Sequence, residues 1–222
     1  MGLDMYLNKM PRYRGATAKD VSAVEDFLDW LKAKDEGKTD CSFQEWCGRD
    51  KVPPLDYINF YSDYYEERYS SWDTEHKYPW ARIIEQVGYW RKANSIHNWF
   101  VENIQDGEDD CDYHREVTEY DLMELLDICK KVLRNSDLVD GLVNNGYEYT
   151  SAGRVPIMTT GKIIRDTSVA EELLPSTSGF FFGSTDYDEY YLDDIAQTIE
   201  IIQKVLDTTD FDKEMVYYVS SW

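Results

Sequence analysis

Hydrophobic residues near the N-terminus recur at every second position, at Leu3, Met5 and Leu7. A period of two is typical of a strand with one buried face, and Pro11 ends the pattern. Near the other end of the chain, residues 215–219 are rich in β-branched and aromatic side chains, which favour strands. We therefore expect one strand at each end of the chain, and we expect the two to pair in the same sheet.

Longer segments show the three- and four-residue spacing of amphipathic helices. The clearest covers residues 192–206, where apolar residues repeat along one side. Ser42 and Glu45 match a capping box and predict a short helical turn that ends near Gly48. The same spacing predicts three further helices, at residues 21–37, 89–104 and 118–133.

The periodicity does not separate helix from strand everywhere. Residues 53–79 are crowded with tyrosine, and residues 141–175 mix turn residues with short apolar runs. Residues 82–87 form a β-prone run before the predicted helix at 89–104. Strand signals at the two ends with helices between them predict an α+β fold, rich in helix, with a small and mostly antiparallel sheet. No linker-like stretch divides the chain, so we expect a single domain over residues 1–222.

The composition indicates a folded protein with a strongly negative surface. The chain has 44 Asp and Glu against 23 Lys and Arg, a formal net charge of −21, and 15% of its residues are aromatic. Disordered acidic chains are poor in aromatics, so that class is excluded. A surface this negative repels nucleic acid and anionic membranes and attracts basic patches on proteins. No apolar run has the length of a bilayer and the start lacks a secretion signal, so we expect a cytoplasmic protein without membrane or direct nucleic-acid contact.

A cluster of aromatic, basic and amide residues is the best candidate for a ligand site. On a helix, Trp90, Asn94 and His97 would share one face, with Arg91 beside it. The aromatic rings could stack a purine, and the guanidinium fork of Arg91 suits a phosphate. The alternative left open is a core helix whose aromatic side chains pack inside the protein. The candidate ligand-binding residues are Tyr89, Trp90, Arg91, Lys92, Asn94 and His97.

A second candidate segment spans residues 179–191. Glycines bracket three phenylalanines, and Ser184 or Thr185 is expected to cap a following helix. The N-terminus of a helix attracts anions. Asp186 and Asp188 would lie in its first turn and oppose a phosphate, which favours a structural role for this segment.

Signals for metal binding and catalysis are weak. Residues 106–112 are rich in carboxylates and His114 follows them, but the spacing lacks the ligand periodicity of a calcium loop, which favours a solvated loop. The chain has no GxSxG, HExxH or phosphate-loop motif, and the spacing of its 4 cysteines matches neither a zinc site nor a disulfide framework. Of the 3 histidines, His97 is the best acid–base candidate. We therefore expect no cofactor and no metal, and we favour a binding role over an enzymatic one.

Three parts of the chain together match a known pattern: Met1 to Leu7 (MGLDMYL), Tyr89 to His97 (YWRKANSIH), and Gly179 to Tyr191 (GFFFGSTDYDEYY) with Tyr217 to Trp222. They resemble a family of small bacteriophage and prophage proteins, and the match covers both ends and the middle. The resemblance brings no activity with it. It implies a setting in which accessory proteins act by binding, either blocking a host protein or sequestering a host signal.

These observations support three hypotheses of function. The first, which we favour, is a phage anti-defence protein in the host cytoplasm that sequesters a small ligand, a nucleotide-type host immune signal, at the cluster around Trp90. The second is an acidic decoy, a nucleic-acid mimic that blocks a basic surface of a host protein, and the acid-rich segments 106–112 and 186–194 support it. The third is a metal-dependent hydrolase built from carboxylates and His97 or His114. The partner is accordingly a nucleotide-like small molecule or a basic host protein, and the sequence leaves the oligomeric state open.

Overall fold

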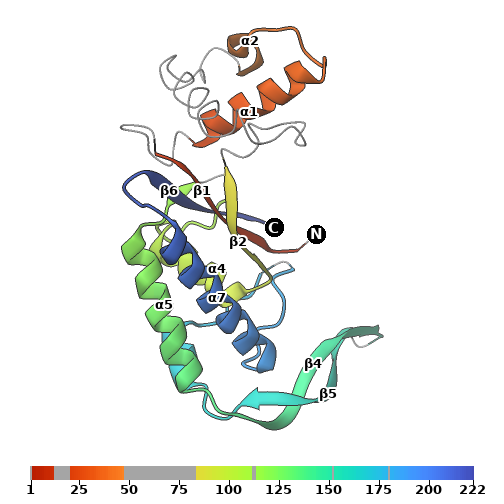
Figure 1. Ribbon diagram of the computed structural model, residues 1–222. Helices are drawn as coiled ribbons and strands as arrows, with labels where there is room; N and C mark the ends of the chain where they lie inside the picture. Colours follow the sequence, from red (N-terminus) through yellow and green to blue (C-terminus); the bar gives the residue numbers. More distant parts are fainter. Residues whose placement is uncertain (1, 13–20, 48–83, 112–113, 152, 180) are drawn as a thin grey trace.

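The computed structural model of the protein describes residues 2–12, 21–47, 84–111, 114–151, 153–179 and 181–222. It confirms the α+β class, with helices packed on a small antiparallel sheet (Figure 1). The tyrosine-rich stretch 53–79, which the sequence left unassigned, lies outside the described residues.

A four-stranded antiparallel sheet forms the centre of the fold. Its strands, in spatial order, are β2 (Glu85–Arg91), β1 (Asp4–Pro11), β6 (Glu214–Ser221) and β3 (Arg115–Glu116). The predicted pairing of the two chain ends is confirmed, because β1 and β6 pair along their whole length, from Asp4 opposite Ser221 to Pro11 opposite Glu214. The alternate apolar residues of β1 are fully buried, as their period of two predicts.

Three helices and the sheet build the main core. They are α4 (Asn94–Asn103), α5 (Glu119–Arg134) and α7 (Glu189–Thr208). The buried residues of α5 and α7 follow the apolar spacing of the sequence, so the helices predicted at 118–133 and 192–206 are confirmed. Phe100 of α4 stacks on Tyr218 of β6, with ring centroids 4.1 Å apart, which fixes the helix layer against the sheet.

Two further helices lie toward the other face of the sheet (Figure 1). They are α1 (Val21–Asp35) and α2 (Phe43–Cys47), and both were predicted. The capping box of α2 is present, because the Ser42 amide donates to Glu45 Oε2 at 2.8 Å and the Glu45 amide donates to Ser42 Oγ at 3.3 Å. The Tyr217 hydroxyl reaches Glu25 of α1 at 3.5 Å. Neighbouring residues of β6 thus serve opposite faces of the sheet.

The prediction of one helix over 89–104 was wrong in its first part. Residues up to Arg91 belong to β2, which pairs with β1, and α4 begins only at Asn94. Trp90 in β2 and Ala93 in the turn after it are both fully buried. Their three-residue separation matches the spacing of an amphipathic helix, although neither residue is helical. Lys92, with a φ of 62°, separates strand from helix.

The stretch 141–175, which the sequence left mixed, contains two long strands and a short helix. They are β4 (Leu138–Thr150), β5 (Gly153–Ile164) and α6 (Ser168–Leu173). β4 and β5 form a separate two-stranded sheet that extends away from the helices as an arm (Figure 1). A bulge between Asn144 and Tyr147 interrupts the register, and this interruption hides the alternation in the sequence.

Candidate functional site

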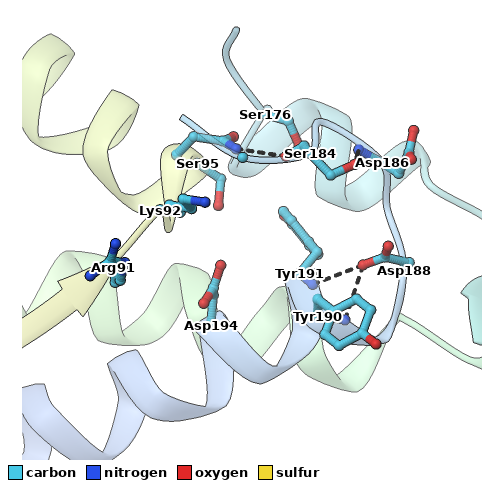
Figure 2. A pocket seen from close by; sticks show the side chains of 12 residues that line it. Arg91, Lys92, Ser95, Ser176, Ser184, Asp186, Asp188, Tyr190, Tyr191 and Asp194 are labelled. Carbon is cyan, nitrogen blue, oxygen red and sulfur yellow. Dashed lines mark hydrogen bonds between the residues drawn. The ribbon is translucent and has the colours of Figure 1, made fainter. Parts of the chain in front are cut away.

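A cavity of about 320 Å³ opens where the end of β2, the start of α4 and the first turns of α7 meet. The loop before α7 forms another wall. Figure 2 shows Arg91, Lys92 and Asp194 on one side of Tyr191, and Asp186 and Asp188 on the other. Its lining residues are Arg91, Lys92, Asn94, Ser95, Ser176, Gly183, Ser184, Asp186, Asp188, Tyr190, Tyr191 and Asp194.

The two basic residues are placed by the end of β2. The Lys92 amide donates to the Leu3 carbonyl at 2.8 Å, and the Asn94 amide donates to the Lys92 carbonyl at 2.8 Å. This tight turn holds Lys92 at a φ of 62°, a conformation that non-glycine residues adopt at a cost and that is common near functional sites. Arg91 Nη1 lies 3.8 Å from Asp4 Oδ1, yet the Arg91 side chain is 59% exposed. Within the described residues, Lys92 has no carboxylate within 4.0 Å.

Asn94 fastens the opposite wall to α4. Its side-chain amide donates to the carbonyls of Phe182 at 3.2 Å and Ser184 at 2.7 Å, and its Oδ1 accepts from the Thr177 amide at 3.1 Å. Gly183 packs so close to Lys92 that an added Cβ would lie 3.3 Å from Lys92 Cβ. These contacts set the distance between the basic side chains and the loop that leads into α7. Asn94 is therefore a positioning residue.

Asp188 forms the N-cap of α7 and still has an unused oxygen. Its Oδ1 accepts from the backbone amides of Tyr190 at 3.0 Å and Tyr191 at 3.1 Å. Its Oδ2 is buried and has no hydrogen-bond partner among the described residues, although Asp188 is only 2% exposed. Burial raises the pKa of this carboxyl above its ordinary value, against the lowering effect of the two amides. A buried acceptor without a partner is costly, so a ligand donor at this point would be favourable.

Asp194 lies about two turns further along α7 and points into the cavity (Figure 2). Burial raises the pKa of Asp194 to about 7, with smaller contributions from the negative charges of Asp193 and Asp188. The carboxyl is therefore close to half protonated at neutral pH and can either donate or accept a hydrogen bond. The Asp194 carbonyl accepts from Thr198 Oγ1 at 2.7 Å, and that hydroxyl accepts from Trp90 Nε1 at 2.9 Å.

The structure places three of the six candidate residues at the cavity, two elsewhere in β2 and one in a separate polar cluster. Arg91, Lys92 and Asn94 line the cavity, as the sequence placed them together. Trp90 is fully buried in the core beneath α7, where it cannot stack on a ligand. Tyr89 faces the other side of the sheet, where its hydroxyl donates to Asp4 Oδ1 at 2.5 Å. His97 lies in the separate polar cluster.

The His97 ring is 1% exposed and is hydrogen-bonded at both nitrogens. Nδ1 lies 2.8 Å from the Tyr218 hydroxyl and Nε2 lies 3.1 Å from Asp109 Oδ2. Asp109 Oδ1 also accepts from Trp222 Nε1 at 3.0 Å. Burial lowers the pKa of His97 despite the neighbouring carboxylate. We call these four residues the His97 cluster; it ties α4 to the C-terminal strand.

Two carboxylates of the acidic segment 106–112 are engaged in contacts with neighbouring side chains. Asp109 belongs to the His97 cluster, and Asp106 forms an ion pair with Arg115 at 2.5 Å. In the part of the chain that the structure describes, no three His, Cys, Asp or Glu side chains are grouped so that they could hold a metal ion. The hydrolase hypothesis therefore gains no support from the described residues.

Sequence reasoning missed the α7 side of the cavity. The expectation that Ser184 or Thr185 caps α7 was wrong: Asp188 is the N-cap. The preceding segment stays extended because the Tyr187 carbonyl accepts from the Ile164 amide at 3.0 Å. One signal was available. Asp194 stands three residues after buried Tyr191 and four before buried Thr198, so it is a carboxylate in the buried stripe of α7.

Comparisons of the chain with protein-family models, curated proteins and solved structures found no match. Among the described residues, no helix is long and apolar enough to cross a membrane.

Proposed function

We propose that the protein binds and sequesters a small nucleotide-type ligand in the cavity between β2 and α7. One observation carries the proposal. Lys92, which has no carboxylate within 4.0 Å among the described residues, and the exposed Arg91, which lies 3.8 Å from Asp4, bring positive charge to the cavity. The largely buried carboxyl groups of Asp188 and Asp194 also line it, and Asp188 Oδ2 has no hydrogen-bond partner among the described residues. A ligand with an anionic end and a hydrogen-bond-donating end satisfies both sides at once.

The basic side of the cavity suits a phosphate. The Arg91 guanidinium can donate two parallel hydrogen bonds to phosphate oxygens, and the Lys92 ammonium adds a second positive charge. The chain as a whole carries a formal charge of −21, which opposes the approach of an anion. At short range the two cations attract an anion to their end of the cavity, whereas the carboxyl groups of Asp186, Asp188 and Asp194 in the same lining oppose it.

The α7 side suits hydroxyl or amino groups. Asp188 Oδ2 can accept a hydrogen bond from a ribose hydroxyl, and Asp194 can accept or donate according to its protonation. Tyr190, whose side chain is exposed at the edge of the cavity, offers a ring face on which a base can stack. A volume of about 320 Å³ lies at the lower end of ligand pockets, ~300–1,000 Å³, and so favours a mononucleotide over a larger ligand.

The proposal is of binding rather than turnover. The described lining residues include no histidine and no cysteine, and the group among them suited to proton transfer is Asp194, whose pKa burial raises to about 7. The resemblance to phage accessory proteins supplies the biological part of the proposal, in which the protein removes a nucleotide signal of host immunity in the host cytoplasm.

A thermal-shift panel tests the proposal. Adenosine 5′-monophosphate at 100 times its dissociation constant should stabilise the protein by ~2.7 kcal/mol, a rise in Tm of roughly 5–10 °C for a chain of this size. Adenosine and inorganic phosphate, which each satisfy one side of the cavity, should shift the Tm much less. If no linear or cyclic nucleotide shifts the Tm, the proposal fails. A basic host protein captured by the same sample would then favour the acidic decoy.

A charge-matched pair of variants locates the binding. Lys92→Gln should reduce or remove the nucleotide shift, because it deletes a cation of the cavity. Lys131→Gln removes the same charge from the exposed last turn of α5 and should leave the shift intact. Equal shifts in the two variants would place the ligand elsewhere.

A further inference from the structure

The β4–β5 arm carries a second surface, separate from the cavity. Across the bulge, Asn144 pairs with Met158 and Tyr147 pairs with Pro156. Met158 and Pro156 are two residues apart and therefore share one face of β5. β4 has one more residue than β5 between these two pairs, so Asn144 and Tyr147 lie on the same face before and after the bulge.

That face carries several exposed apolar side chains, with polar residues such as Asn144 and Thr160 between them. Its large hydrophobic residues, which we call the arm face, are Leu138, Leu142, Tyr147, Tyr149 and Met158, with exposed fractions of 40%, 59%, 42%, 85% and 46%. Monomeric soluble proteins rarely expose a continuous apolar surface of this kind, and such surfaces commonly mark an interaction site. The arm face is therefore a candidate interface.

The arm is also electrically neutral in a strongly acidic protein. Residues 138–164 contain two acids, Asp140 and Glu148, and two bases, Arg154 and Lys162, whereas the whole chain carries −21. Asp140 and Lys162 lie on the arm face and pair with each other at 2.6 Å. The face thus offers no unpaired carboxylate to attract a basic partner.

Among the described residues, hydrogen bonds from the backbone of the arm to the body lie at its base. The Ile164 amide donates to the Tyr187 carbonyl at 3.0 Å, and the Lys162 amide donates to Glu189 Oε1 at 3.1 Å. An isolated two-stranded hairpin is marginally stable in water, and stability usually needs further strands or a packed face. The outer part of the arm therefore has a physical reason to acquire a covering layer.

We propose that the arm face packs against the arm face of a second copy of this chain, in a two-fold dimer. A face with few charges and several exposed apolar side chains can complement itself, and two such faces can meet with less repulsion than two acidic bodies. The length of the arms also separates the bodies: 12 or 13 residues at ~3.3 Å each span roughly 40 Å.

The size of the contact sets the expected strength. Two strands give a face ~10 Å wide, so each copy contributes about 400 Å² and the dimer buries about 800 Å². A standard stable interface buries ~1,600 Å². The dimer should therefore be weak and concentration-dependent, and added salt should not dissociate it, because its contacts are apolar.

Sedimentation velocity of the full chain, from micromolar to several hundred micromolar, tests the proposal. The parent should shift from monomer to dimer, and Leu142→Glu or Met158→Glu should remain monomeric at every concentration. Ile157→Glu is the matched control, because Ile157 is 43% exposed on the opposite face of the same arm, and it should dimerise like the parent.

Circular dichroism melts confirm that each variant is folded, since all three substitutions are at exposed positions. A parent that stays monomeric over the whole range overturns the proposal. So does a dimer that both arm-face variants retain, or binding of the parent, as a monomer, to neutral lipid vesicles through the arm.

Discussion

The His97 cluster and the cavity at Arg91 are two polar regions beside the same helix, and they differ in one property. In the His97 cluster, each ring nitrogen of His97 has a partner and both oxygens of Asp109 are used. In the cavity, Asp188 Oδ2 has no partner, and Lys92 has no carboxylate within 4.0 Å among the described residues. Buried polar groups that all hydrogen-bond to one another are typical of structural support. Polar groups that line a cavity without hydrogen-bond partners are suited to binding a ligand.

The two regions also differ in the protonation of their titratable groups. A carboxylate only accepts hydrogen bonds, so Asp109 assigns the proton of His97 to Nε2 and leaves Nδ1 to accept from the Tyr218 hydroxyl. Burial lowers the pKa of His97 and keeps the ring neutral. In the cavity, burial raises the pKa of Asp194 to about 7, so a carboxyl there is held ready to change its charge near neutral pH.

The largest loss of stability is expected for Trp90→Ala. Trp90 is fully buried and anchors the turn of α7 that carries Asp194 through Thr198. Removing the ring should lower the free energy of unfolding by ~3–5 kcal/mol, measured by denaturant titration. A loss below about 1 kcal/mol would contradict the assignment of Trp90 to the core and would return it to the candidate ligand site.

His97→Ala should be the next most damaging change. It opens a cavity and leaves the buried Tyr218 hydroxyl without its nitrogen acceptor, which together cost about 3 kcal/mol. Nucleotide affinity of the folded fraction should stay within about twofold of the parent, because His97 does not line the cavity. Loss of binding without loss of stability would reverse the roles that we assign to the two regions.

Asp194→Asn should instead stabilise the protein, and only at higher pH. The folded-state pKa of about 7 lies above the ordinary 3.8, so the folded state keeps a proton that the unfolded chain loses across this window. The contribution of Asp194 to stability therefore falls as pH rises from about 4 to about 7. The Asn side chain has no charge to bury, so the variant does not lose stability as the pH rises. A shift in pKa is worth ~1.4 kcal/mol per unit, and after a discount for partial exposure we expect the free energy of unfolding to rise by about 2 kcal/mol at pH 8 and to stay unchanged at pH 4.

Asp127→Asn on the exposed side of α5 is the charge-matched control for this experiment and should show neither effect. Denaturant titrations at several pH values give the comparison. A gain that is equal at all pH values would show that Asp194 is not the titrating group.

The sequence predicted those elements whose burial follows a single period. β1, α5 and α7 each have one buried side, so apolar spacing located them. β2 was partly missed because Trp90 and Ala93 are buried by different elements at a helix-like separation. The β4–β5 arm was missed because its apolar residues are exposed and a bulge shifts their alternation.

The sequence named only one side of the cavity. Arg91 and Lys92 were found because their chemistry is visible in the residues themselves. Asp188 and Asp194 lie far along the chain, and only the packing of α7 against β2 brings them to the same cavity. Their unusual protonation is a product of burial, which no local pattern of carboxylates reveals.

The most direct test of the central claim is calorimetric titration of the nucleotide with the largest thermal shift into the parent and two variants. Arg91→Ala should weaken binding by roughly 10- to 100-fold, the loss expected for a charged hydrogen bond. The same change should move the free energy of unfolding by less than ~0.5 kcal/mol, because the side chain is 59% exposed. Arg134→Ala, at the exposed end of α5, should bind like the parent. Equal affinity for all three proteins would contradict the assignment of the cavity as the ligand site.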